Sequence, residues 1–338
     1  METAAFDYDL PEAAIAQTPA EPRDSARLLV DEGPGRPPRH GHVTDLPALV
    51  GPGDVVVLNT TKVLPARLRL TRPSGGAAEV LLLEPLDAQE HTWEALVRPS
   101  RKLAPGTALR AGDDFTVVVG DDLGEGRRHV ELVLAAEGTL LECLDRHGAM
   151  PLPPYIHTPL ADPTRYQTTY ADQPGSVAAP TAGLHLTPAV LDGIRAAGAA
   201  VHPVELVVGL GTFRPIATAT VEAHQMHAER YWVPEPTMAA CQGAERVVAV
   251  GTTTVRALEA AAATGQLAGR TELFIHGDRP FALVDALVTN FHQPRSSLLV
   301  LIDAFVGPRW RDLYVTALAE GYRFLSFGDA MFLRGERT

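Results

Sequence analysis

The chain has 338 residues, which is long enough for one large or two ordinary domains. Hydrophobic residues make up 46% of the sequence and charged residues 21%, a balance that favours a folded chain over a disordered one. The formal net charge of -12 argues against a protein that coats nucleic acid through a uniformly basic surface, but it leaves room for a local basic patch.

The cysteines and the first residues of the chain favour the cytoplasm as its compartment. Cys143 and Cys241 supply neither a disulfide framework nor a Cys-x-x-Cys pair, which is typical of a reducing compartment. The first residues are acidic, whereas a signal peptide begins with a basic stretch followed by an apolar one. The apolar run at 298–302 is too short to cross a membrane. We therefore expect a cytoplasmic protein that is neither exported nor inserted in a membrane.

Two different sequence patterns follow each other in the first half of the chain. Residues 1–58 predict a helix from Leu10 onward, a loop rich in proline and glycine, and a buried strand at 55–58. Residues 59–150 contain short strand patterns separated by glycine turns, with few helical patterns between them, which predicts a small antiparallel β-barrel or sandwich. These strands are expected at 80–83, 92–97, 115–119 and 129–134.

The remainder alternates helices and strands behind a proline-rich connector at 151–155. Thr187 and Pro188 offer an N-cap and a proline at the first helical position. The expected strands are 204–208, 246–250, 273–275 and 283–288, and further helices are expected at 255–263, 296–305 and 309–320. The fold class is therefore α/β, with a main domain formed by 1–58 and 151–338 that is interrupted by an inserted β domain at 59–150.

Two glycine-containing turns could bind a ligand. A strand at 246–250 runs through Gly251 into a helix whose first turn carries Thr252, Thr253 and Thr254. Free N–H groups at a helix N-terminus attract carboxylate or phosphate oxygens, although an ordinary threonine-capped joint has the same pattern. The segment 208–213 holds two glycines, for which a tight turn is the commoner explanation. Neither turn matches a dinucleotide or P-loop motif.

Histidines are the candidate proton acceptors, because their pKa is the one most easily tuned to neutral pH. His185 precedes the helix cap, His227 lies in the phrase His224-Gln-Met-His227-Ala-Glu229, and His292 follows Thr289-Asn-Phe. A hydrogen-bonded structural role is equally compatible with each of them. The His-x-x-His spacing lacks the i, i+4 geometry of a helical zinc pair, so we expect no metal.

Basic residues gather in two clusters of an otherwise acidic chain, and they could hold phosphates or simply form a solvated face. The cations expected to contact nucleic acid are Lys62, Arg67, Arg69, Arg72, Arg98, Arg101 and Lys102.

Long phrases along nearly the whole chain resemble the S-adenosylmethionine:tRNA ribosyltransferase-isomerase family of queuosine biosynthesis. They include Phe6-Asp-Tyr-Asp-Leu-Pro11, Gly175-Ser-Val-Ala-Ala-Pro-Thr-Ala-Gly-Leu-His185, Val208-Gly-Leu-Gly-Thr-Phe-Arg-Pro215, Gly251-Thr-Thr-Thr-Val-Arg-Ala-Leu-Glu259, Thr289-Asn-Phe-His292 and Gly328-Asp-Ala-Met331. So many phrases in one order are highly specific.

The resemblance implies an α/β domain interrupted by a β-barrel, and it implies the reaction. In that family S-adenosylmethionine is a co-substrate that gives up its ribosyl group. The group passes to 7-aminomethyl-7-deazaguanine (preQ1) at the tRNA wobble position and is isomerised, which gives epoxyqueuosine and releases adenine and methionine. The sulfonium acidifies the neighbouring ribose C–H, a base removes that proton, adenine departs, and the amine attacks before ring closure expels methionine. No metal or further cofactor is implied, and a monomer is favoured.

The same resemblance places candidate residues on this chain. Candidates for the base and its orienting groups are His185, His227, His292, Asp285 and Glu229. Candidates for donor binding are Thr181, Gly183, Gly209, Gly211, Thr212, Phe213, Gly251, Thr252, Thr253, Arg256 and Asn290.

Four positions depart from the usual family pattern. Thr60 stands where an aspartate is common, Lys62 where an arginine is common, Leu70 where a glycine is common and Leu186 where a phenylalanine is common. These departures leave open a paralogue that uses the same donor with a free deazapurine acceptor. A noncatalytic RNA-binding module is the second alternative.

Overall fold

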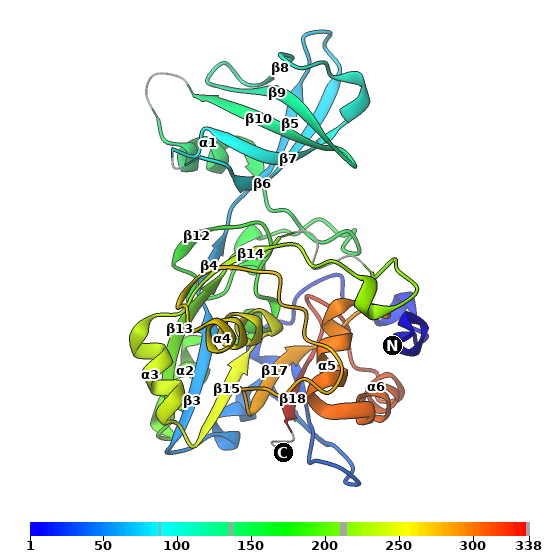
Figure 1. The fold of residues 1–338 in the computed structure, drawn as a ribbon, viewed down its shortest axis with the longest axis vertical. Helices are drawn as coiled ribbons and strands as arrows, with labels where there is room; N and C mark the ends of the chain where they lie inside the picture. The colour runs from blue at the N-terminus through cyan, green and yellow to red at the C-terminus, as the bar shows by residue number, and fades with distance from the viewer. Residues whose placement is uncertain (88, 135–137, 210–214, 336–338) are drawn as a thin grey trace. The chain divides into compact units, whose positions relative to one another are not determined.

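The computed structural model describes residues 1–87, 89–134, 138–209 and 215–335, and the chain divides into two compact units (Figure 1). The first unit consists of Met1–Lys62, Pro153–Gln173 and Ala179–Thr338, and the second of Val63–Leu152 and Pro174–Ala178. The fold class expected from the sequence, an α/β unit interrupted by a closed antiparallel barrel, is confirmed.

A nine-stranded sheet forms the centre of the first unit. Its order across the sheet is β16 (Ala268–Thr271), β14 (Glu229–Trp232), β13 (Ala200–Leu206), β3 (Asp54–Asn59), β15 (Arg246–Val250), β17 (Ala286–Asn290), β18 (Ala330–Arg334), β1 (Arg27–Val30) and β2 (Arg39–His42). The four strands β13, β3, β15 and β17 run parallel, whereas β18 runs antiparallel to β17. The carboxyl ends of four neighbouring strands therefore meet at one edge.

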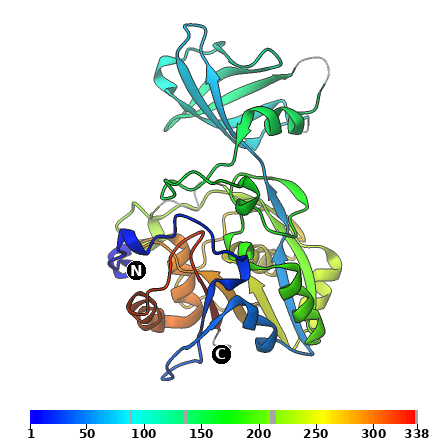
Figure 2. The same cartoon turned by 180° about the vertical axis from the view of Figure 1, so that it is seen from behind.

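Helices cover both faces of this sheet, which explains why its central strands read as unbroken apolar runs. The helices are α2 (Pro188–Ala196), α3 (Glu235–Gly243), α4 (Thr252–Thr264), α5 (Ser297–Val306) and α6 (Trp310–Ala319). One core combines Ile194 of α2 with Val56, Val248 and Val288 of the sheet. Figure 1 shows α4 in front of the sheet, and Figure 2, seen from behind, shows α2 on the other side.

The helix starts follow the local sequence signals. The Thr187 hydroxyl accepts a hydrogen bond from Val190 N at 3.3 Å, and Pro188 occupies the first turn of α2. Ser296 caps α5 in the same way, through Leu299 N at 3.2 Å. The helices predicted at these two places are confirmed.

Several predicted elements differ from those observed. The helix expected from Leu10 is a single 3-10 turn at Glu12–Ala14, because Pro11 starts it without a capping side chain. The strand expected at 273–275 is absent and the edge strand is β16, where Arg270 pairs with Arg230 of β14. Helix α3 was not predicted because its apolar periodicity is weak and three proline or glycine residues lie in or next to it.

Six strands close the barrel of the second unit. Their order is β5 (Arg67–Thr71), β6 (Ala77–Pro85), β7 (Thr92–Arg98), β10 (Arg127–Leu134), β9 (Phe115–Gly124) and β8 (Ala108–Ala111), and the pairing of β8 with β5 closes the ring. Trp93 and Phe115 fill its interior. The helix α1 (Leu140–His147) and the short strand β11 (Gly148–Ala149) follow, while β4 (Thr61–Val63) and β12 (Gln173–Ser176) form a separate two-stranded pair.

Among the described residues, every helix is too short or too polar to cross a membrane.

Candidate functional site

The edge where the parallel strands end carries a series of polar residues. Asn59 is the last residue of β3, Gly251 follows β15, and Asn290 is the last residue of β17. Because β18 is antiparallel, its first residue Ala330 pairs with Asn290, so the preceding loop reaches the same edge. Ligands of open α/β sheets bind in the crevice outside the carboxyl ends of the strands.

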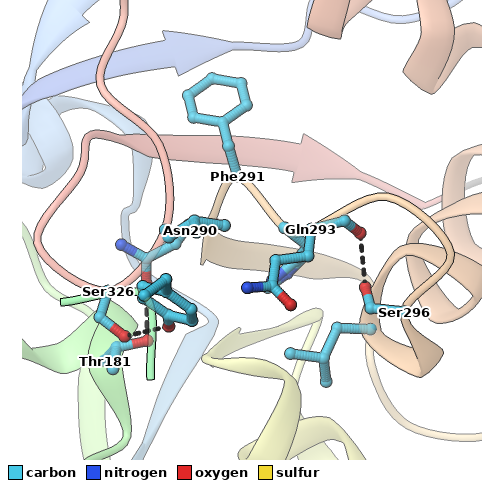
Figure 3. A pocket seen from close by; sticks show the side chains of 10 residues that line it. Thr181, Asn290, Phe291, Gln293, Ser296 and Ser326 are labelled. Carbon is cyan, nitrogen blue, oxygen red and sulfur yellow. Dashed lines mark hydrogen bonds between the residues drawn. The ribbon is translucent and has the colours of Figure 1, made fainter. Parts of the chain in front are cut away.

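A pocket of about 330 Å³, open mouth included, lies at the end of β17. It is lined by Tyr155, Thr181, Asn290, Phe291, His292, Gln293, Ser296, Leu298, Leu325 and Ser326. Figure 3 shows Thr181, Asn290 and Ser326 gathered on one side of the pocket and the Phe291 ring pointing away from them. That ring stacks on Phe324 with centroids 4.6 Å apart, so it belongs to the core and fixes the backbone on which Asn290 and His292 stand.

A three-residue hydrogen-bond network joins the sheet edge to the 3-10 helix η7 (Thr181–His185). The Thr181 hydroxyl donates to Asn290 Oδ1 at 3.1 Å, which leaves the Asn290 amide group to donate to His185 Nε2 at 3.2 Å. This arrangement assigns the His185 proton to Nδ1 and makes Nε2 the acceptor.

The environment of His185 keeps its imidazole neutral. The ring is 4% exposed, and burial lowers its pKa to about 4, with the charge of Arg323 acting in the same direction. A second pocket of about 210 Å³ adjoins His185 and is lined by Arg23, Arg165 and Ser326 among others. His185 therefore lines the second pocket and contacts Asn290 of the first, and the two pockets share Ser326.

His292 is the second buried histidine of this edge. Burial lowers its pKa to about 3, and its Nε2 lies 2.9 Å from the Thr289 hydroxyl. Its backbone N–H donates to the Tyr314 hydroxyl at 2.9 Å, and its carbonyl accepts from Tyr8. Tyr314 of α6 and Tyr8 therefore fix the backbone of His292, while Thr289 of β17 contacts its ring.

Tyr155 and Ser326 are two of the lining residues that were not predicted. Their hydroxyls are 2.7 Å apart, and burial raises the pKa of Tyr155 to about 12. Ser326 reaches the pocket because Leu325 adopts a left-handed φ of 69° and because Gly328 fits where a Cβ would lie 2.4 Å from Arg323 O. Tyr155 ends the proline-rich connector noted in the sequence, Ser326 lies outside the phrases quoted there, and nothing in the sequence pointed to either side chain.

The start of α4 lies beside this network. Gly251 has a φ of 90°, which an L side chain rarely adopts, and a Cβ there would lie 3.7 Å from Ala182 of η7. Asn59 donates to the Thr253 hydroxyl at 3.3 Å and to Leu206 O at 3.0 Å. Asn59 was not among the predicted site residues, yet it joins β3, β13 and α4.

A third group fastens the backbone at Gly209 to α4. Glu229 accepts from the backbone N–H of Gly209 at 3.0 Å and forms an ion pair with Arg256, and both charged side chains are 5% exposed. Arg256 also donates to Leu273 O at 3.1 Å. The contacts of these two charged residues therefore hold backbone in place.

The remaining candidates lie elsewhere or serve packing. His227 is exposed and lines neither pocket. Asp285 precedes β17 at its amino end, where its carboxylate accepts from Val247 N at 2.8 Å. Gly183 leaves room for the Tyr170 hydroxyl, which would lie only 2.0 Å from a Cβ added at position 183. Gly211, Thr212 and Phe213 lie outside the residues that the structure describes.

No cluster of three or more His, Cys, Asp or Glu side chains that could hold a metal ion occurs in the described part of the chain.

The basic residues of the barrel separate into groups. Arg69 and Arg98 both pair in register with Glu79 of β6, so the three side chains share one outer face, and Arg67 lies two residues from Arg69 on the same face. Arg101 and Lys102 are exposed on a 3-10 turn, and Lys62 is exposed on β4 of the first unit. Arg72 instead folds over Gly76.

Two of the four departures from the family pattern are buried. Leu186 is 0% exposed in the core beneath η7, and Leu70 is 3% exposed in the barrel. Thr60 donates from its backbone to Val204 O at 3.0 Å. Two of the four changes therefore alter packing and contact no acceptor.

Comparison with known proteins gives a consistent result. The family model described as "Queuosine biosynthesis protein" matches residues 3–333. The S-adenosylmethionine:tRNA ribosyltransferase-isomerase of Rubrobacter xylanophilus is 51% identical over 99% of this chain and 98% of its own, and that of Symbiobacterium thermophilum is 47% identical over 98% and 100%. The crystal structure of S-adenosylmethionine tRNA ribosyltransferase from Thermotoga maritima is 34% identical, with a TM-score of 0.55 over 97% of this chain and 99% of that one. The chain therefore belongs to the queuosine biosynthesis protein family.

Proposed function

We propose that this protein transfers and isomerises the ribosyl group of S-adenosylmethionine onto 7-aminomethyl-7-deazaguanine at the wobble position of tRNA, releasing adenine and methionine. The observation that carries the proposal is the network at the end of β17, where Thr181 and Asn290 line a pocket and Asn290 orients the buried, neutral His185. This pocket lies in a chain that matches ribosyltransferase-isomerases over its full length.

We assign the general base to His185. Deprotonation next to a sulfonium needs an acceptor that is unprotonated at neutral pH, and burial of His185 provides that state. Its Nε2 lone pair accepts from Asn290, so the incoming substrate must displace this weak contact before the proton is taken. His292 lines the pocket at the end of β17 and is the second candidate, for proton delivery to the departing adenine.

Donor binding is assigned to the strand ends beside this pocket. Gly251, Thr252 and Thr253 begin a 13-residue helix, whose first N–H groups favour a carboxylate and whose hydroxyls suit a ribose. Gly209 is held next to them by Glu229 and Arg256, to which we give a positioning role. Asp285 is a structural residue, because its carboxylate contacts backbone at the opposite end of β17.

Acceptor binding is assigned to the exposed cations. An RNA backbone requires a local positive surface on a chain of net charge -12. Arg67, Arg69 and Arg98 on one barrel face, together with Arg101 and Lys102, are the cations assigned on the second unit, and Lys62 is assigned separately on the first. Charge reversal in Arg98→Glu should weaken tRNA binding and lower its salt slope by about 1. Arg195→Glu, an exposed cation on α2, is the matched control.

The co-substrate is S-adenosylmethionine, without a metal or further cofactor, and we expect a cytoplasmic monomer. Chromatography of a reaction with preQ1-containing tRNA tests the chemistry: adenine and methionine should form together. Accumulation of S-adenosylhomocysteine would identify a methyltransferase instead. Turnover with the free deazapurine but not with tRNA would favour the paralogue, and binding without turnover would favour an RNA-binding module.

A further inference from the structure

We propose that Trp232, with Arg230 and Arg270 beside it, is a stacking platform for a single-stranded nucleotide that flanks the modified base in the anticodon loop. The inference rests on the proposed function, because the acceptor is taken to be tRNA. None of the three residues is among the expected tRNA contacts, and all three lie in the first unit.

Trp232 is an unusual tryptophan for this chain. Its side chain is 47% exposed, whereas Trp93 and Trp310 are each 1% exposed. Strand β14 alternates strictly, with Glu229 and Tyr231 buried against α4 and Arg230 and Trp232 exposed on the opposite face. An indole is among the best ring systems for stacking on a nucleobase, and a half-exposed one has a free face for it.

Charges around the indole are arranged in a definite order. Arg230 and Trp232 are two residues apart on one face, and Arg270 of the edge strand β16 pairs directly with Arg230. On the other flank Glu205 of β13 pairs with Trp232, and burial followed by the charge of Asp172 raises the pKa of Glu205. Cations therefore occupy the outer strands and a carboxylate the inner one.

That order fits one strand of RNA in one orientation. Phosphates are attracted to Arg230 and Arg270 and repelled by Glu205, so the backbone should follow the sheet edge. A base turned inward then stacks on Trp232, and its N–H groups face the Glu205 carboxylate, which is an acceptor. A protein partner would not require an aromatic face between cations and an acceptor, whereas stacked single strands are bound in this way.

The platform and the pocket at the end of β17 belong to the same sheet. Trp232 is three residues from Glu229, the first residue of β14, or about 10 Å along the strand at about 3.3 Å per residue. Strand β17 is four positions from β14 in the sheet, or about 19 Å at about 4.8 Å per strand. A nucleotide on the platform is therefore a few positions from the reacting base, within one anticodon loop.

The experiment measures binding of preQ1-containing tRNA by fluorescence anisotropy and turnover by adenine release, in the full-length protein. Trp232→Ala should raise the Kd for tRNA by about 5- to 150-fold, the range for loss of one base–aromatic stack. Trp232→Phe, which keeps an aromatic face, should recover most of the affinity. Val315→Ala removes another exposed apolar side chain, on α6, and is the matched control, with an unchanged Kd.

Quenching gives an independent readout, because Trp232 is the exposed tryptophan of the three. Bound tRNA should protect it from acrylamide, and Arg230→Glu should reduce that protection. Equal tRNA Kd values for wild type and Trp232→Ala, or a change in the Kd for S-adenosylmethionine alone, would overturn the platform. Absence of turnover in the wild type would overturn the proposed function, while the tRNA Kd values would still decide on the platform.

Discussion

The buried ion pair between Glu229 and Arg256 gives a sharp test of whether these residues position the backbone at Gly209. Both side chains are 5% exposed, so each charge depends on the other for compensation. The perturbation is a double-mutant cycle with Arg256→Met and Glu229→Leu, singly and together. Methionine and leucine keep much of the side-chain volume, so the cycle reports mainly on charge and hydrogen bonds.

The expected magnitudes follow from what each variant leaves behind. Either single change leaves one buried charge without its partner, which lowers the free energy of unfolding by about 3–5 kcal/mol. The double variant leaves no buried charge unpaired. It removes the hydrogen bonds of Glu229 to Gly209 N and of Arg256 to Leu273 O, at a cost of about 1–3 kcal/mol each. The double variant should therefore be clearly less destabilised than the sum of the single variants. It should also bind S-adenosylmethionine more weakly, because Gly209 is no longer held.

Differential scanning calorimetry and urea unfolding followed by circular dichroism measure these differences. At about 2–4 °C per kcal/mol for a unit of this size, each single variant should lower the Tm by roughly 6–20 °C. Additive effects in the double variant would refute the coupling. A double variant with recovered stability and unchanged donor affinity would refute the positioning role of Glu229 and Arg256.

Three further predictions concern η7 and its contacts with β17 and Tyr170. The pKa of His185 is about 4 in the folded chain against about 6.5 in an unfolded one, so the unfolded state binds more protons between these values. The free energy of unfolding should be highest above pH 6.5 and fall by about 3 kcal/mol as the pH drops towards 4. His185→Gln should flatten that part of the stability profile. An unchanged slope in the variant would contradict the burial of His185. Asn290→Asp places a carboxylate next to His185 Nε2 and should raise the histidine pKa, which NMR titration of labelled histidine measures; a constant pKa would contradict the contact. Gly183→Ala puts a Cβ 2.0 Å from the Tyr170 hydroxyl and should cost about 1–3 kcal/mol in thermal unfolding, part of which Tyr170→Phe should recover. Equal losses with and without the Tyr170 hydroxyl would locate the strain elsewhere.

Local signals determined much of the architecture from the sequence alone. The Thr187-Pro188 cap, the apolar run of β3 and the Gly251 joint each encode their structure within a few residues, because caps, strand burial and positive φ depend on neighbouring atoms. The regular alternation of 59–150 indicated a barrel or sandwich, but closure depends on the long-range pairing of Thr71 with Arg110, which no local pattern reports. The absence of a strand at 273–275 has the same origin, since an edge strand forms only where a partner strand is available.

The site shows the same division. Sequence phrases identified His185, Asn290 and Thr181 as candidates, but their joining into one network required the carboxyl end of β17 to meet η7, 105 residues away for the histidine contact. Tertiary packing also decided that Glu229 and Arg256 neutralise each other. The exposure of Trp232 was likewise outside the reach of composition, because an indole on an alternating strand can face either side. Packing of the sheet fixes which side it faces. Glu229 and Tyr231 contact α4, and because side chains alternate along a strand, Trp232 points to the opposite, exposed face.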